Sequence, residues 1–161
     1  EFQNSVINYG VELWPFRVRV PTVSSNVRSK ISIHSTLDKS YQRWYILGMK
    51  PILNASFFRS DSGNEPVREW LKTLPATDRR IMGEDIKTVQ FGWPLGMPLV
   101  RHLDGGIWEI RVKLENRIAR ILFCLEGSTM VILHGFIKKQ QATPKQDLDL
   151  AKDRLKILKR K

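Results

Sequence analysis

Basic side chains on three consecutive predicted strands give the strongest indication of chemistry in this chain. Arg111 and Arg120 each lie inside an otherwise apolar strand, where a guanidinium is costly unless it has a partner or a ligand. His134 lies on the next strand, and a lysine pair ends that strand. On neighbouring strands these groups would form a cationic cleft for phosphate, which arginine can bind through two hydrogen bonds. The candidate catalytic residues are Arg111, Arg120, Lys138, Lys139, His134 and Glu109.

Such a cleft suits RNA cleavage in which the RNA's own 2′-hydroxyl attacks the adjacent phosphate. Fixed cations would stabilise the charge that develops there, which is commonly the largest contribution to catalysis. Proton transfer could fall to His134, to Glu109 or to a lysine whose pKa neighbouring cations lower. The sequence has no glycine-rich phosphate loop, no His/Cys metal spacing and no His-Glu-x-x-His, so we expect neither a metal nor a cofactor.

Each candidate also has an ordinary structural explanation. Arg111 and Arg120 could pair across the strands with Glu109 or Glu126. The lysine pair could be a solvated strand end, and alternation places His134 among apolar neighbours, as for a core histidine. These alternatives stay open at the level of sequence.

The charge of the chain indicates an anionic partner. Its 27 lysines and arginines against 16 aspartates and glutamates give a net charge of +11, which favours a nucleic acid or an acidic protein as partner. No apolar stretch approaches the roughly 18 residues of a membrane helix, no secretion signal is recognisable, and the single cysteine suits a reducing compartment. We therefore expect a cytoplasmic protein with no membrane partner. Further RNA contacts are expected from Arg101, Lys113, Arg117 and Lys145.

Hydrophobic periodicity predicts an α+β domain in the order β-α-α-β-β-β-α. A strand at Pro51–Arg59 comes first, and two helices beginning at Pro66 and near Thr77 follow as a helical hairpin. The segment Gly92–Pro98, with two glycines and two prolines, is expected to be a loop.

An antiparallel meander and a helix are expected to complete the domain. Thr143 is the predicted N-cap of the C-terminal helix, with Gln146 closing a capping box. Strands joined by short turns must pair antiparallel, and three such strands are predicted at residues 107–113, 118–126 and 129–137.

The first 48 residues differ from the rest in their pattern of polar and apolar residues. Residues 1–48 contain polar stretches and scattered aromatic residues without a sustained period, whereas the orderly pattern begins at Met49. We interpret residues 1–48 as a non-native or poorly ordered extension and residues 49–161 as the working domain.

Four separated motifs of residues 49–161 resemble the phage-derived HigB branch of the RelE/ParE toxin superfamily. They occur in the order typical of that branch. The motifs are Ser62–Leu71, Phe91–Pro98, Gly106–Arg111, and His134–Lys139 with Thr143-Pro144.

The resemblance implies a RelE-like fold and a toxin of a type II toxin–antitoxin system. It further implies a ribosome-dependent endoribonuclease that cuts translated mRNA, and a HigA-like helix-turn-helix antitoxin as partner. Matched motif to motif, Arg111 and Arg120 take the family's basic positions on the central strands, and Lys138 or Lys139 the one beyond the last strand. Some relatives have a second basic residue in place of Glu109 and a tyrosine near the C-terminus, whereas this chain has no tyrosine after Tyr45.

Two further functions are compatible with these features. A ParE-like inhibitor of DNA gyrase would bind protein and cut no RNA. A non-catalytic RNA-binding module would bind RNA with a steep salt dependence and leave it intact.

Overall fold

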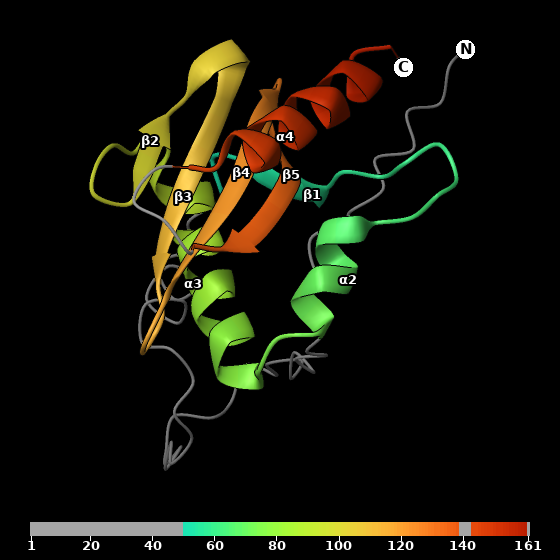
Figure 1. Ribbon diagram of the computed structural model, residues 1–161. Coiled ribbons are helices and arrows are strands. Elements are labelled where there is room, and N and C mark those ends of the chain that lie inside the picture. Colours follow the sequence, from blue (N-terminus) through green and yellow to red (C-terminus); the bar gives the residue numbers. More distant parts are fainter. Residues whose placement is uncertain (1–49, 139–142, 161) are drawn as a thin grey trace, which may run out of the picture. The chain divides into compact units, whose positions relative to one another are not determined.

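The computed structural model of the chain describes residues 50–138 and 143–160 (Figure 1). The extension expected at residues 1–48 and the candidate Lys139 lie outside the described residues, whereas every other candidate site residue lies within them. No helix in this part of the chain is long and apolar enough to cross a membrane.

A five-stranded sheet forms the middle of the fold, with the strand order β1-β5-β4-β3-β2. The strands β3, β4 and β5 follow one another through short turns and pair antiparallel, which confirms the predicted meander. The strand bounds are Asn54–Phe57 for β1, Val100–His102 for β2, Ile107–Lys113 for β3, Ile118–Glu126 for β4 and Thr129–Ile137 for β5.

Two features of the sheet correct the prediction. β1 pairs parallel with β5, so the sheet is mixed and not a purely antiparallel meander, and β1 is shorter than the expected Pro51–Arg59. β2 is an additional edge strand that pairs with β3. Both differences arise because strand partners come from distant parts of the chain, and a strand of three residues leaves no periodic pattern to detect.

Three helices cover the sheet in the described part of the chain. They are α2 (Pro66–Lys72), α3 (Ala76–Gly92) and α4 (Lys145–Leu158). Pro66 stands in the first turn of α2, and α3 follows α2 after a short connection, as the sequence predicts. The capping box at α4 was a wrong prediction, because Pro144 is the N-cap residue and no side chain caps that helix.

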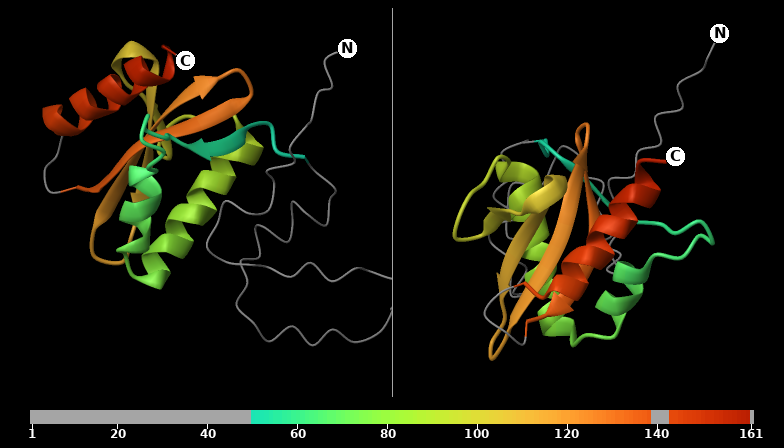
Figure 2. Two further views of the ribbon diagram at one scale, coloured as in Figure 1. Left: turned by 90° about the vertical axis from the view of Figure 1, so that its right-hand side faces the viewer. Right: turned by 45° about the horizontal axis from the view of Figure 1, so that its top comes forward.

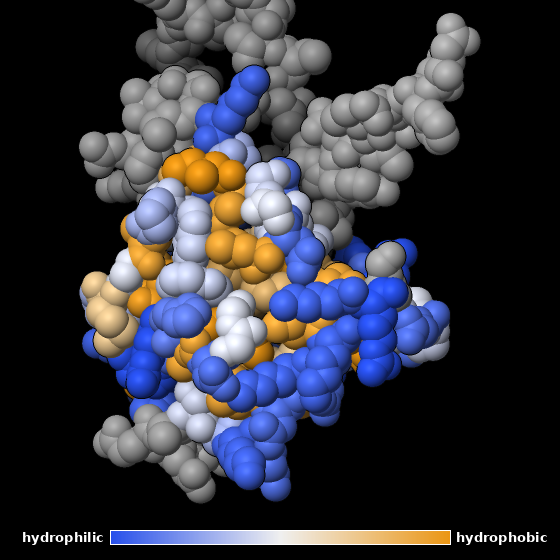
Figure 3. All heavy atoms as spheres, turned by 90° about the horizontal axis from the view of Figure 1, so that it is seen from above, coloured by the Kyte–Doolittle hydropathy of each residue, from blue (hydrophilic) through white to orange (hydrophobic). Residues whose placement is uncertain are grey.

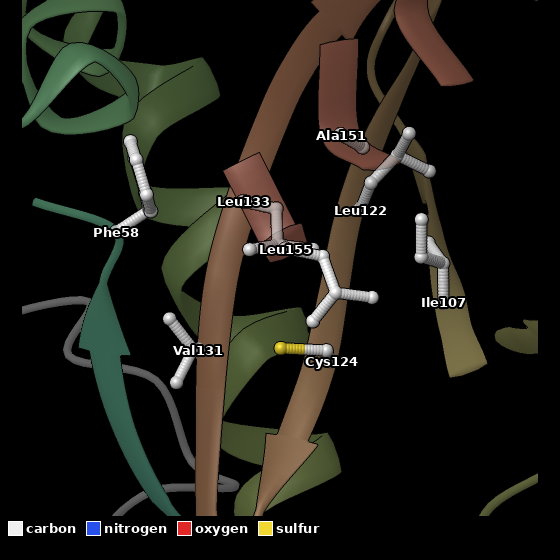
Figure 4. Close-up of a cluster of buried hydrophobic side chains, with 8 residues drawn as sticks. All are labelled: Phe58, Ile107, Leu122, Cys124, Val131, Leu133, Ala151 and Leu155. Carbon is white, nitrogen blue, oxygen red and sulfur yellow. The ribbon is translucent and has the colours of Figure 1, made fainter. Parts of the chain in front are cut away.

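The helices divide between the two faces of the sheet. α4 lies on one face, and α2 and α3 lie on the other (Figures 1 and 2). Under α4, Ala151 and Leu155 pack on buried side chains of the strands, Cys124 among them (Figure 4). Burial raises the pKa of the Cys124 thiol to about 11, which places this cysteine in the core as a protonated thiol.

Gly135 lets α2 approach β5 closely. A Cβ atom at Gly135 would stand only 2.3 Å from the ring of Trp70 on α2. The small residue of the His134-Gly135-Phe136 motif therefore makes room for the tryptophan of the Glu69-Trp70-Leu71 motif, which connects two of the sequence motifs in space.

Candidate functional site

Strand register brings the predicted cations together on one face of the sheet. Arg111 on β3 is paired directly with Arg120 on β4, and Arg101 on β2 is paired with Glu109 on β3. Directly opposed residues share a face, and side chains two residues apart share it too. Glu109 is also opposite Leu122, which packs in the core cluster under α4. The four charged residues therefore lie on the α4 face.

The Glu109 carboxylate is the centre of this cluster and is fully buried. Its Oε1 accepts a hydrogen bond from Nη1 of Arg120 and lies 3.7 Å from Nε of Arg111. Its Oε2 accepts a hydrogen bond of 2.6 Å from the hydroxyl of Thr143. A buried carboxylate is tolerated when it is paired and hydrogen-bonded in this way. Both oxygens of Glu109 are thus engaged.

Arg120 is buried, whereas Arg111 reaches the surface. The side chain of Arg120 is 3% exposed, whereas that of Arg111 is 30% exposed. Burial lowers the pKa of Arg120, the charge of Glu109 opposes that shift, and the charges of Arg111 and Arg101 add to it. Cross-strand pairing with Glu109, one of the two explanations open from the sequence, therefore describes Arg120.

Thr143 has a different partner from the one its sequence context indicated. Thr-Pro before a helical pattern is typical of a cap, but here the hydroxyl reaches across to β3 and bonds Glu109. The start of α4 is thereby attached to the charged cluster. Sequence periodicity contains no signal for this contact, because its two residues are 34 positions apart.

His134 joins β5 to α4. Its Nε2 lies 2.7 Å from Oδ1 of Asp147, and its Nδ1 lies 3.4 Å from Nη1 of Arg154. Arg154 also donates to the backbone oxygen of Leu133 at 2.7 Å. Burial lowers the pKa of His134; the Asp147 hydrogen bond opposes the shift, and the charge of Arg154 adds to it. Both ring nitrogens therefore have partners within the protein.

Asp147 and Arg154 are members of this site that the sequence analysis missed. They are spaced seven residues apart on α4, with the fully buried Ala151 between them. Positions i, i+4 and i+7 share one helix face, so these two polar residues belong to the face that α4 turns to the sheet. This spacing is the feature of the sequence from which the two residues could have been predicted.

The described candidate cations other than Arg111, Arg120 and Arg117 are accessible to solvent to different degrees. Arg101, Lys113 and Lys145 are exposed, and Lys138 is half-buried. The backbone nitrogen of Lys138 donates to the oxygen of Ile118, and Ile118 is paired with Lys113 on β3. Lys138 and Lys113 therefore lie at the same level of the sheet, on either side of β4. Figure 3 shows one face of the molecule, on which hydrophilic side chains form a broad area beside smaller hydrophobic patches.

Arg117 is not brought to the cluster. Its guanidinium forms an ion pair with Asp78 of α3, which lies on the opposite side of the sheet from α4. Lys139 lies outside the described residues.

The described residues, 50–138 and 143–160, contain no group of three or more His, Cys, Asp and Glu side chains arranged to hold a metal ion. The chemistry that the cluster offers is electrostatic. A buried carboxylate fixes two arginines, and the outer one, Arg111, presents part of its guanidinium to solvent. A guanidinium held in this way is suited to bind an anion with two oxygens, such as a phosphate.

Comparison with known proteins shows both a family likeness and similar individual proteins. Residues 69–156 match a family described as phage-derived Gp49-like proteins. In two strains of Mycobacterium tuberculosis, a protein named probable endoribonuclease HigB1 is 33% identical to this chain over 105 residues, which make up 65% of the chain and 83% of that relative.

Proposed function

The chain belongs to the Gp49-like family of phage-derived proteins and is HigB-like, and on that premise we propose that it is a toxin that cleaves RNA. The toxin would belong to a toxin–antitoxin pair, and cleavage would need no metal ion. The matched residues 69–156 include Glu109, Arg111, Arg120 and Thr143, so the charged cluster lies in the part of the chain that carries the family likeness.

The observation that carries the proposal is the position of Arg111 above a buried, already neutralised pair. Because Glu109 compensates the charge of Arg120 within the protein, the charge of the more exposed Arg111 is available for an external anion. Arg101 and Lys113 extend the positive surface on the same face of the sheet. A chain with a net charge of +11 meets a polyanion under favourable electrostatics.

In the proposed reaction the 2′-hydroxyl of RNA attacks the neighbouring phosphorus. The O2′–P bond forms and the P–O5′ bond breaks, which leaves a 2′,3′-cyclic phosphate and a free 5′-hydroxyl. One proton leaves the 2′-oxygen and one is added to the 5′-oxygen. Arg111 would bind the non-bridging oxygens and stabilise the negative charge that grows on them in the transition state, with Lys138 as a second cation.

Glu109 and His134 are two of the three candidates for proton transfer, a lysine being the third, and we assign these two a positioning role first. Both ring nitrogens of His134 have partners, and Glu109 is fully buried with both of its carboxylate oxygens hydrogen-bonded, so neither group presents a free acceptor to solvent. Glu109 would hold the arginines, and His134 would hold α4 against β5. Arg120 would support Arg111 from below.

The finer expectations are part of the proposal. We propose that the substrate is mRNA on the ribosome, that the protein acts in the cytoplasm, and that a HigA-like antitoxin neutralises it. Arg101, Lys113 and Lys145, all exposed, would contact RNA outside the cleaved bond. Arg117 would contribute only if RNA extended round to the α3 side.

The test is to induce the full chain in cells and map new 5′ ends on transcripts, with translation running and with translation blocked. We expect new ends with 5′-hydroxyl groups in the wild type and their loss in Arg111→Ala. A matched control is Arg80→Ala, because Arg80 is an arginine in a surface ion pair with Glu84 on α3. That variant should cut like the wild type.

Two outcomes would contradict the proposal. Equal cutting by Arg111→Ala and the wild type would remove the arginine from the site. Intact transcripts together with DNA damage signalling would identify a gyrase inhibitor, and intact transcripts with RNA binding alone would identify a non-catalytic binding module.

A further inference from the structure

Met97 is an exposed apolar side chain beside the candidate phosphate-binding arginine. It is 60% exposed, the most exposed large hydrophobic residue in the described part of the chain. Its Sδ lies 3.7 Å from Nη1 of Arg111. Water therefore reaches a thioether that touches the same guanidinium to which we assign the phosphate.

The segment that carries Met97 is attached to β3. The backbone nitrogen of Arg111 donates to the oxygen of Leu99 at 2.8 Å, and the nitrogen of Val100 donates to the oxygen of Gly96 at 3.0 Å. The loop thus turns back on itself around Met97 and is bonded to the residue that Met97 contacts. Met97 and Arg111 are positioned by the same hydrogen bonds.

Aromatic packing fixes the other end of this loop. Trp93 packs edge-on against Trp108, with ring centroids 4.9 Å apart, and against Phe123 at 5.9 Å. Trp108 and Phe123 are directly opposed on β3 and β4, so the loop begins on the sheet itself. An apolar side chain held outward by such anchors, and not folded into the core, is available to a ligand.

From this arrangement we propose that Met97 packs against the nucleobase next to the phosphate bound by Arg111 and so influences where RNA is cut. The inference rests on the proposed function and goes beyond it. A phosphate held by Arg111 brings its attached nucleosides with it, and an unpaired base offers an apolar face to a neighbouring side chain. Methionine sulfur packs favourably on aromatic rings, and its flexible chain accommodates different bases. The expected result is a preference among bases, not an absolute requirement.

The test compares cut sites in cells that express the full chain as wild type, Met97→Ala or Met97→Leu. In Met97→Ala the base preference next to the cut should weaken about two- to tenfold, the range that corresponds to one sulfur–aromatic contact. Met97→Leu keeps an apolar side chain of similar volume and should keep most of the preference. Ile52→Ala is the matched control, since Ile52 is 53% exposed and lies just before β1, at the opposite edge of the sheet from β2.

The outcomes separate this inference from the proposed function. An unchanged base preference in Met97→Ala, or a uniform fall in cutting at all sites with the preference preserved, would overturn the role of Met97 while leaving the nuclease proposal intact. No new transcript ends in the wild type would overturn both. Because Met97 is exposed, all variants should unfold at the same temperature as the wild type, which thermal unfolding checks.

Discussion

The two faces of the sheet bury different kinds of side chain from the same strands. On the face covered by α3, the alternate residues of β3 and β4 are fully apolar, as at Ile110, Val112 and Phe123. On the face covered by α4, the residues between them include a fully buried Glu109 and a nearly buried Arg120. One face is an ordinary core, and the other buries charge.

This difference indicates which face of the sheet carries the function. An apolar pair of similar volume is often as stable as a buried ion pair, or more stable, so a buried pair is weak evidence that stability alone placed it there. In this protein the buried pair lies beside Arg111 on the same face of the sheet and is bonded to Thr143 at the start of α4. We interpret the α3 face as the one that stabilises the fold and the α4 face as the one that positions the reactive cations.

Removal of Glu109 should have the largest effect on stability. Glu109→Ala leaves the Arg120 charge buried without its partner and should lower the free energy of unfolding by about 3–5 kcal/mol. The apolar face gives the contrast, because Ile110→Val should lower it by only about 0.5–1.5 kcal/mol. Denaturant unfolding followed by circular dichroism measures both.

A double variant shows whether the loss comes from the unpaired charge. Glu109→Leu combined with Arg120→Leu should recover most of the stability, because no charge is then buried, but it should not recover cleavage. If the double variant cleaved RNA like the wild type, the buried pair would have no positioning role.

Truncation of Arg111 should separate activity from stability. Arg111→Ala should lower the rate of RNA cleavage about 10²–10³-fold, as expected for loss of one preorganised donor to the transition state. Its free energy of unfolding should change by less than about 1 kcal/mol, because the side chain is partly exposed and Glu109 keeps Arg120. A loss of stability as large as that of Glu109→Ala would show that Arg111 belongs to the structural pair and not to the reactive surface.

Unlike Glu109, Asp85 on α3 has no cation or hydrogen-bond donor among the described residues that lowers its pKa. Burial, and then the charge of Glu84, raise the pKa of Asp85 from 3.8 to about 6. Between these values the folded protein binds more protons than the unfolded chain, so stability falls as pH rises through this range. Asp85→Asn should therefore be more stable than the wild type at pH 7, by less than about 3 kcal/mol because solvent screens this partly exposed group, and the difference should vanish below about pH 3. Thermal unfolding across pH checks this, and a variant less stable at pH 7 would contradict it.

The contact between His134 and Asp147 should have the smallest effect. Asp147→Ala removes one hydrogen bond between β5 and α4 and should lower the free energy of unfolding by about 1 kcal/mol. Because burial already lowers the pKa of His134 and Asp147 opposes that shift, the variant should lower the pKa further. Below pH 6.5 the unfolded chain binds the proton more readily, so the wild type should lose stability as pH falls. An NMR titration of the histidine, with a pKa unchanged or raised in the variant, would disprove the coupling.

The sequence predicted those parts of the molecule that local patterns determine. Alternation along 107–113 placed Glu109 and Arg111 on one side, and short turns required the neighbouring strand to bring Arg120 beside them. The positions of α2 and α3 followed from Pro66 and from apolar spacing.

Local patterns could not predict contacts between distant segments of the chain. The parallel pairing of β1 with β5 and the bond from Thr143 to Glu109 each join residues far apart in the chain, and a threonine before a proline has a cap as its common local use. The sequence predicts that His134 either acts or is buried, and no local pattern indicates that its partners are Asp147 and Arg154 on α4.

The claim that Arg111 holds a phosphate is tested most directly by the salt dependence of RNA binding. A short single-stranded RNA with 2′-O-methyl groups, which cannot be cleaved, is titrated with wild type, Arg111→Ala and Arg80→Ala at several salt concentrations. We predict that Arg111→Ala binds more weakly and that the slope of log affinity against log salt is smaller in magnitude by about 0.7, the value for one lost phosphate contact on a single strand. Arg80→Ala should match the wild type, and an Arg111→Ala slope identical to that of the wild type would contradict the claim.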